Sequence, residues 1–208
     1  GVTVTHFVDH NVHTVTLTAL EAGIRPEALE VSFPLPASLL DPVESLYFYE
    51  DSAHTNDVSG VFTYADHVRC EIAQLAVFKN LSSNATFLAG LCTMHRFWSV
   101  MFLRDHTVIF RFELEGRELA VGEAYTMERF MVAEGTPNGE HALMEAYADG
   151  VADLNNCIPT GDLPVGWCSW SCFYSDVNED RIRTAADMQV MYAHEGRPNL
   201  VQIDDGWQ

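Results

Sequence analysis

Apolar and polar residues alternate with a period of two along most of the first 135 residues. In residues 107–114, for example, Val108, Phe110 and Phe112 share one face, whereas Arg111 points to the other. This alternation is typical of strands that are buried on one side. It predicts strands at residues 2–5, 13–17, 29–33, 46–49, 60–65, 72–78, 85–92, 98–103, 107–114 and 125–132. About ten short strands with turn residues between them predict a large antiparallel β-sandwich domain over residues 1–135.

The spacing of apolar residues becomes helical after Asn138, a residue type that often begins helices. The predicted buried face of this helix consists of Leu143, Ala146, Tyr147, Val151 and Leu154. Residues 155–164 contain Asn, Gly and Pro without periodicity, so they predict a linker. We therefore expect a linking helix and linker over residues 136–163, followed by a further segment over residues 164–208.

Residues 164–208 contain two short apolar segments on either side of a helical one. The strand candidates are residues 165–170 and 200–203. The helix between them begins at Asp176, with Glu179 completing a capping box, or alternatively at Asn178. Its predicted face consists of Ile182, Ala185, Ala186, Gln189, Tyr192 and Ala193, and residues 194–198 end it. This order predicts a βαβ unit, whose parallel strands need more covering structure than the sequence supplies, so the fold is expected to be incomplete at Gln208.

The 208 residues include 30 acidic and 11 basic side chains, which give a formal net charge of −19. This excess argues against nucleic acid and against anionic membranes as partners. No apolar run reaches the ~18–20 residues of a membrane span, so we expect a cytoplasmic protein. A hydrophobic content of 48% excludes an intrinsically disordered chain. The length leaves no room for a sandwich and a complete (β/α)8 barrel of about 250 residues.

The five cysteines and nine histidines show no spacing that is typical of a metal site. Cys168 and Cys172 lie four residues apart, but no cluster of histidines accompanies them. No P-loop or dinucleotide-binding fingerprint occurs in the sequence either. We therefore expect no metal, no cofactor and no disulfide framework. Glu123 and Glu128 are predicted to lie on a solvated face or in ion pairs.

Two adjacent carboxylates, Asp204 and Asp205, follow the second predicted strand of the βαβ unit. The carboxyl ends of parallel strands are where α/β folds bind their ligands. Ionised carboxylates are strong acceptors for hydroxyl groups, so the pair could bind a sugar. Alternatively, Asp204, Asp205 and Gly206 form a turn in which the side chains bind their own backbone.

Trp167 and Trp170 are a second candidate pair, because an indole ring offers a flat surface on which a sugar can stack. Strand alternation places them on opposite sides of residues 165–170, so that one packs in the core and the other faces a cavity. Trp170 is the candidate for the cavity, since it lies nearer the carboxyl end of the strand. Gly166 would allow close approach of a neighbouring backbone.

The motifs on either side of the last predicted helix occur together in one known family. Four motifs resemble, in order and spacing, the start of the catalytic barrel in glycoside hydrolase family 36 of clan D. They are PVGWCSW (164–170), FY (173–174), DV (176–177) and VQIDDGWQ (201–208). This family contains the α-galactosidases, or melibiases, and the raffinose-synthase-type galactosyltransferases. The family's N-terminal β-supersandwich and connecting helix also have counterparts here. They resemble residues 87–90, 122–123 and 128–130 and the helix ending near Asp153.

The resemblance implies a β-sandwich followed by the truncated start, the first βαβ, of a TIM barrel. It also implies the N-terminal part of a retaining α-galactosidase, an enzyme that hydrolyses terminal α-linked galactose from oligosaccharides. Asp204 and Asp205 would then bind the O4 and O6 hydroxyls of galactose, and Trp170 would line the same pocket. The family's nucleophile and acid/base are aspartates on later barrel strands, so no residue of this chain is given either role and the chain alone is expected to be inactive.

Two other functions stay open at this point. A galactosyltransferase of the raffinose-synthase type would pass galactose to a sugar acceptor, and Ser171 and Cys172 depart from the residues that often follow the second Trp in the family. A non-catalytic module that binds carbohydrate or mediates oligomer contacts is the third reading. The enzyme readings imply an α-galactoside as partner and several hundred further residues with both catalytic carboxylates, and they leave a homo-oligomer open.

Overall fold

The computed structural model describes residues 1–51, 59–66, 69–158, 161, 165–191 and 200–207. The chain divides into two compact units, Gly1–Cys157 and Ile158–Gln208. Among the described residues, no helix is both long enough and apolar enough to cross a membrane.

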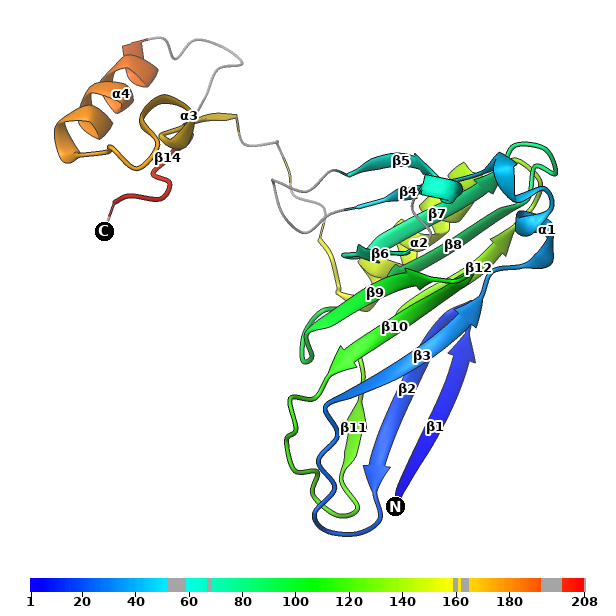
Figure 1. Cartoon of the computed structure of the whole chain (residues 1–208). Helices are drawn as coiled ribbons and strands as arrows, with labels where there is room; N and C mark the ends of the chain where they lie inside the picture. Colours follow the sequence, from blue (N-terminus) through cyan, green and yellow to red (C-terminus); the bar gives the residue numbers. More distant parts are fainter. Residues whose placement is uncertain (52–58, 67–68, 159–160, 162–164, 192–199, 208) are drawn as a thin grey trace. The chain divides into compact units, whose positions relative to one another are not determined.

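The first unit contains two antiparallel sheets that pack face to face (Figure 1). Sheet A has eight strands in the order β1-β2-β12-β8-β7-β4-β5, with β11 also beside β2. Sheet B has four strands in the order β3-β10-β9-β6. The strand bounds in sheet A are β1 Val2–Asp9, β2 Val12–Ala19, β4 Leu46–Glu50, β5 Gly60–Thr63, β7 Leu75–Asn80, β8 Thr86–Leu91, β11 Ala124–Thr126 and β12 Phe130–Gly135. Those in sheet B are β3 Ala28–Pro34, β6 Arg69–Ile72, β9 Ser99–Arg104 and β10 Thr107–Glu113.

Short helical turns connect several of these strands. The helix α1 spans Ala37–Leu40, and the 3-10 turns η1 and η2 span Val43–Ser45 and Tyr64–Asp66. The β-rich, mostly antiparallel sandwich predicted from the period-two pattern is confirmed. Alternate side chains of β2 and β10 are buried, as that pattern requires.

Aromatic side chains from both sheets meet in the centre of the sandwich. Phe130 of sheet A stacks on Phe110 of sheet B, with 4.1 Å between the ring centroids. Phe33 and Phe112 of sheet B and His13 of sheet A surround the same ring. Aromatic pairs of this kind contribute about 0.5–1.5 kcal/mol each beyond the area that they bury. Phe130 therefore joins the two sheets into one core.

The helix α2 (Glu140–Leu154) packs on the face of sheet A that points away from sheet B. Leu143 and Tyr147 are its buried residues, and the Tyr147 hydroxyl donates to the carbonyl of Leu91 at 2.5 Å. Two glycines of the sheet allow this approach. A Cβ on Gly90 would lie 2.6 Å from Cε2 of Tyr147, and one on Gly135 would lie 2.8 Å from Cδ1 of Leu143.

The start and one face residue of α2 differ from the prediction. Gly139, not Asn138, is the N-cap residue, because Asn138 has a positive φ of 57° and belongs to the preceding turn. Ala146 is exposed rather than part of the buried face. The sequence predicted a domain over residues 1–135 and a separate linking helix, and this boundary stays a prediction. In the structure, α2 packs against strands of sheet A and belongs to the first unit.

Two predicted strands are each interrupted in the structure. Residues 72–78 contain the end of β6 and the start of β7, which belong to different sheets. The Asp51 carboxylate accepts the backbone N–H groups of Gln74 and Leu75 at 2.8 Å, and so it stabilises the crossing between the sheets. Residues 125–132 likewise contain β11 and β12, separated at residues 127–129. The strand predicted over 60–65 ends at Thr63, where η2 begins.

The interruption before β12 places Glu128 inside the protein, so the prediction of a solvated or ion-paired Glu128 is wrong. Its side chain is 3% exposed and accepts the hydroxyl of Thr93 at 2.6 Å. The backbone N–H groups of Arg96 and Phe97 donate to its other oxygen at 2.5 and 3.1 Å. Burial raises the pKa of Glu128, but these hydrogen bonds outweigh burial and hold the pKa below its usual value. A charged carboxylate therefore fixes the loop over residues 93–97.

Replacing Glu128 by Gln should destabilise the protein by about 1.5–3 kcal/mol at neutral pH, because the loop loses a charged acceptor. The loss should shrink as the pH falls below 4.5, where the carboxylate of the unfolded wild type becomes protonated. Urea unfolding at several pH values measures both effects. Glu134→Gln, at an exposed site in the same strand region, is the control and should change stability by less than about 0.5 kcal/mol. Equal losses in the two variants would contradict the anchoring role.

His13 is a second titratable group in the core, with a side chain that is 8% exposed. Its ring stacks on Phe130 at 5.0 Å, and its Nδ1 lies 2.8 Å from Nε2 of His6. Burial, and to a smaller extent the neighbouring His6, together lower the pKa of His13 to about 4. The folded protein therefore holds His13 neutral over a pH range in which the unfolded chain protonates it.

Stability should fall as the pH decreases from 6.5 towards 4, since the unfolded state binds a proton at His13 that the folded state does not. His13→Phe should weaken this part of the pH dependence, whatever its effect on absolute stability. Thermal unfolding between pH 4 and 8 measures the slope. His141→Gln removes an exposed histidine of α2 and should leave the slope unchanged. A His13→Phe variant with the wild-type slope would show that His13 titrates normally.

The second unit contains the parallel strand pair β13 (Gly166–Cys168) and β14 (Leu200–Gln202). Between them in sequence lie α3 (Trp170–Phe173) and α4 (Glu179–Met191). The predicted order of strand, helix and parallel strand is therefore present. A Cβ on Gly166 would lie 2.6 Å from the carbonyl oxygen of Leu200, so the predicted close approach at this glycine is observed.

Asn178 is the residue that caps α4, which confirms the alternative start of this helix. Its Oδ1 accepts the backbone N–H of Arg181 at 3.0 Å. Asp176 and Glu179 do not form the predicted capping box, because they pair with Arg181 and Arg183 instead. On the predicted face, Ala185 is buried, and Ile182, Ala186 and Gln189 are partly buried. Tyr192, Ala193 and the stop over 194–198 lie outside the described residues.

Candidate functional site

The carboxyl ends of β13 and β14 lie side by side, because the two strands are parallel and Cys168 is paired with Gln202. The backbone N–H of Ser169 continues this pairing by donating to the carbonyl of Gln202 at 3.1 Å. The Ser169 hydroxyl then accepts the backbone N–H of Asp204 at 2.9 Å. The loop after β13 is thus hydrogen-bonded to the loop after β14.

Both carboxylate oxygens of Asp204 accept hydrogen bonds within this unit. Oδ1 accepts the backbone N–H of Asp205 at 2.8 Å. Oδ2 accepts the thiol of Cys168 and the side-chain amide of Gln202, each at 3.2 Å. The bond from Asp205, followed by that from Cys168, lowers the pKa of Asp204 below its usual value, although burial acts in the opposite direction. Asp204 is therefore an ionised acceptor at neutral pH.

Asp205 is exposed, and its Oδ1 accepts the backbone N–H of Gly206 at 2.8 Å. Each of the two aspartates thus binds the N–H of the next residue, which agrees with the turn that the sequence left as an alternative. Gly206 has a positive φ of 93°, which a side chain would disfavour. In the part of the chain that the structure describes, Oδ2 of Asp205 accepts no hydrogen bond. A ligand could therefore reach this oxygen without displacing a protein group.

The two tryptophans differ in burial, but of the two it is Trp167, not the predicted Trp170, that lines a hollow formed by described residues of the second unit. Trp167 is partly buried and packs edge-on against Phe173, with 5.9 Å between the ring centroids. Trp170 is 41% exposed and contacts Tyr174 edge-on at 5.3 Å. The prediction that Trp170 ends the strand is wrong, because β13 stops at Cys168 and Trp170 begins α3. Its exposure therefore follows from a helix position rather than from strand alternation.

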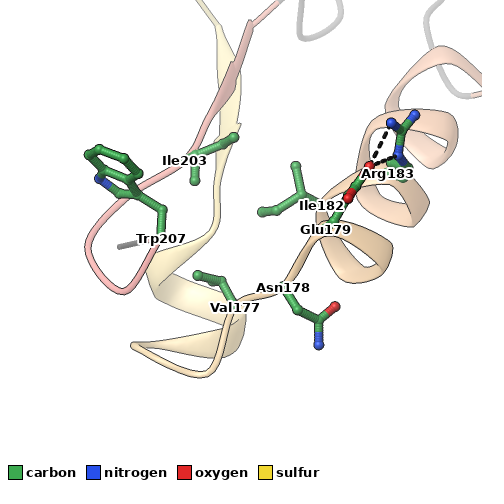
Figure 2. A pocket seen from close by; sticks show the side chains of 7 residues that line it. All are labelled: Val177, Asn178, Glu179, Ile182, Arg183, Ile203 and Trp207. Carbon is green, nitrogen blue, oxygen red and sulfur yellow. Dashed lines mark hydrogen bonds and ion pairs between the residues drawn. The ribbon is translucent and has the colours of Figure 1, made fainter.

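Two hollows are lined by described residues of the second unit, and neither is lined by Asp204, Asp205 or Trp170. One, of about 470 Å³, is lined by Val177, Asn178, Glu179, Ile182, Arg183, Ile203 and Trp207. Figure 2 shows the apolar side chains of Ile182, Ile203 and Trp207 around this space, with the Glu179–Arg183 ion pair at its edge. The other, of about 560 Å³, is lined by Trp167, Cys172, Phe173, Asp180, Arg181, Thr184, Ala185, Met188 and Gln189. Neither of these two hollows therefore includes the two aspartates.

Sequence reasoning missed two residues of this site, Cys168 and Ser169. It weighed Cys168 only as a metal ligand and gave Ser169 no role. The available signal was their position, since a residue at the end of one parallel strand can reach the loop that follows the next strand. Among the described residues, no group of three or more His, Cys, Asp or Glu side chains is placed to hold a metal ion.

Comparisons with known proteins found a matching family model for part of the chain and a similar solved structure. Residues 159–208 match the family model described as raffinose synthase or seed imbibition protein Sip1. A solved structure, the galactosidase domain of an alpha-galactosidase-sucrose kinase, AgaSK, superposes with a TM-score of 0.53 and 14% sequence identity. The superposition covers 99% of this chain and 31% of the other. No curated protein matches the sequence.

These findings support the fold and the family resemblance at different levels. At 14% identity, the structural match shows that the β-rich fold resembles the corresponding part of a galactosidase domain. The family match covers the βαβ unit and includes both sequence motifs. The resemblance to glycoside hydrolase family 36 is thereby confirmed, and the chain spans about 31% of the length of the galactosidase chain that it matches.

Replacing Gly206 by Ala should disrupt the loop after β14. A Cβ there would lie 2.6 Å from both Cα and the carbonyl oxygen of Ser175, in addition to the strain of a positive φ. Gly23 is the matched control, because its φ is 80° but a Cβ there would meet no atom within 4 Å. We expect about 1 kcal/mol of local destabilisation for Gly23→Ala and at least twice that for Gly206→Ala. Hydrogen exchange over residues 200–207 and 20–25 measures each, and equal effects would contradict the close contact with Ser175.

Proposed function

We propose that the full-length protein is a retaining α-galactosidase, and that this chain supplies its N-terminal β-sandwich and the first βαβ unit of a (β/α)8 barrel. The family match over residues 159–208 carries this proposal. It includes both sequence motifs, whose residues Ser169 and Asp204 are hydrogen-bonded to each other. The parallel pairing of β13 and β14 and the mostly apolar hollows beside α4 also support it. A short parallel pair with apolar flanks is what a barrel unit presents to neighbouring strands and helices.

In the proposed site, Asp204 and Asp205 accept hydrogen bonds from the O4 and O6 hydroxyls of a terminal galactose. The low pKa of Asp204 favours this role, because a charged acceptor binds a hydroxyl more strongly than a neutral one. The axial O4 distinguishes galactose from glucose, and an equatorial hydroxyl would leave the acceptor unpaired at a cost in affinity. In this proposal, the exposed indole of Trp170 supplies an apolar surface to the same sugar site.

Hydrolysis with retention needs two further carboxyl groups about 5–5.5 Å apart, one as the nucleophile and one as the acid and then the base. We assign neither role to a residue of this chain. Asp204 and Asp205 bind substrate in this proposal, and the 208-residue chain alone is inactive. The proposed reaction uses no metal and no cofactor.

A galactosyltransferase is the second candidate, and the description of the matching family as raffinose synthase favours it. The donor site would be the same, since both reactions form a galactosyl-enzyme. They differ in whether water or a sugar hydroxyl completes the second step. A non-catalytic carbohydrate-binding module is the remaining possibility, and it predicts binding of galactosides without turnover.

The full-length protein should cleave p-nitrophenyl α-D-galactoside and leave the α-D-glucoside intact. Asp204→Asn and Asp205→Asn should each lower kcat/KM by about 10–100-fold, as expected for loss of a charged hydrogen bond. Asp187→Asn, at an exposed position of α4, is the control and should keep wild-type activity. Product analysis with raffinose, with and without added sucrose, separates free galactose from transfer products. Cleavage of the glucoside alone would overturn the substrate assignment.

A further inference from the structure

The dipeptide Cys168-Ser169 contacts Asp204 at both its side chain and its backbone. The Cys168 thiol donates to Oδ2 of Asp204 at 3.2 Å, and the Ser169 hydroxyl accepts the Asp204 N–H at 2.9 Å. Cys168 ends β13 and Ser169 follows it, whereas Asp204 lies in the loop after β14, about 35 positions further along the sequence. Both contacts are tertiary, so they fix one loop relative to the other.

The register of the parallel pair explains why the dipeptide can make these contacts. Cys168 is paired with Gln202, and Ser169 donates its N–H to the carbonyl of Gln202. Asp204 lies two residues beyond Gln202, so its side chain turns back towards the end of β13. Ser169 is completely buried, which prevents water from replacing its hydroxyl as the acceptor for Asp204.

These contacts restrict the directions from which a ligand can approach Asp204. An ionised carboxylate has about four acceptor sites, and the groups of Cys168, Gln202 and Asp205 occupy three of them. One direction remains for a hydroxyl of a ligand. Asp205, in contrast, has an oxygen that accepts no hydrogen bond from the described residues and can adapt to its ligand.

We propose that Cys168 and Ser169 are positioning residues that hold the Asp204 carboxylate in a single orientation for one sugar hydroxyl. This inference rests on the proposed function, because it assigns a ligand to Asp204. The dipeptide itself does not touch the substrate. A pre-oriented acceptor loses less side-chain entropy on binding, and it discriminates more sharply between an axial and an equatorial hydroxyl.

The test uses the full-length protein and p-nitrophenyl α-D-galactoside. Cys168→Ala should lower kcat/KM about tenfold, the effect of losing one hydrogen bond to a charged group. Cys168→Ser retains a donor and should recover activity to within about threefold of the wild type. Cys172→Ala is the matched control, since Cys172 is an exposed cysteine of α3 only four residues further along the sequence, and it should remain within about twofold of the wild type. Ser169→Ala should also lower kcat/KM.

A double-mutant comparison separates positioning from general stabilisation. In an Asp204→Ala background, Cys168→Ala should cause no further loss, because the group that it positions is already missing. A further tenfold loss in that background would overturn the proposal, and so would a Cys168→Ala variant with wild-type kcat/KM. A positioning role also predicts that Cys168→Ala narrows the preference for galactoside over the 4-deoxy-galactoside, which a purely structural defect would leave unchanged.

The test also distinguishes this inference from failure of the proposed function. If the wild-type protein cleaves no α-galactoside, the proposed function is wrong, and crystal structures of the wild type and Cys168→Ala then decide the positioning role. Rotation of the Asp204 carboxylate in the variant would support positioning by the thiol. An unchanged Asp204 side chain would overturn it.

Discussion

All six residues of β8 are buried, because sheet B covers one face of sheet A and α2 covers the other. Phe87 and Ala89 point to the core shared with sheet B, whereas Leu88 points to α2. Full burial of one such side chain contributes about 1.5–3 kcal/mol, and neither face could be exposed without losing that contribution. The need to cover both faces accounts for the order of layers in the first unit. It also explains why the helix expected to link two domains packs within the first of them.

The same requirement distinguishes the second unit from the first. There, a two-stranded parallel sheet lies beside α4 with two mostly apolar hollows next to it. Its two strand ends are joined by polar contacts, namely the Ser169 and Cys168 bonds to Asp204, and Asn178 caps the start of α4. The orientation of Asp204 is therefore set by hydrogen bonds between the two strand ends rather than by the packing of apolar side chains around it.

Local patterns in the sequence predicted what depends on neighbouring residues. The alternation in residues 107–114 predicted β10, and the position of Asp204 and Asp205 after an apolar strand predicted that they lie at a strand end. The strand breaks near residues 73 and 128 could not be predicted, because each involves hydrogen bonds between a carboxylate and backbone groups that are far apart in the sequence. Glu128 reaches the loop at 93–97, more than 30 residues away. The bond from Cys168 to Asp204 was missed for the same reason, since only the register of the paired strands reveals it.

Gly90 and Gly135 have a consequence for the path of the chain. Because neither carries a Cβ, α2 rests on the backbone of sheet A, and the depth of the helix is set by two absent methyl groups. At its far end, the side-chain amide of Asn155 donates to the carbonyl of Cys92 at 2.8 Å. The helix is therefore secured at both ends to the same strand region. The contacts of α2 with sheet A therefore fix the position at which the chain leaves the sandwich.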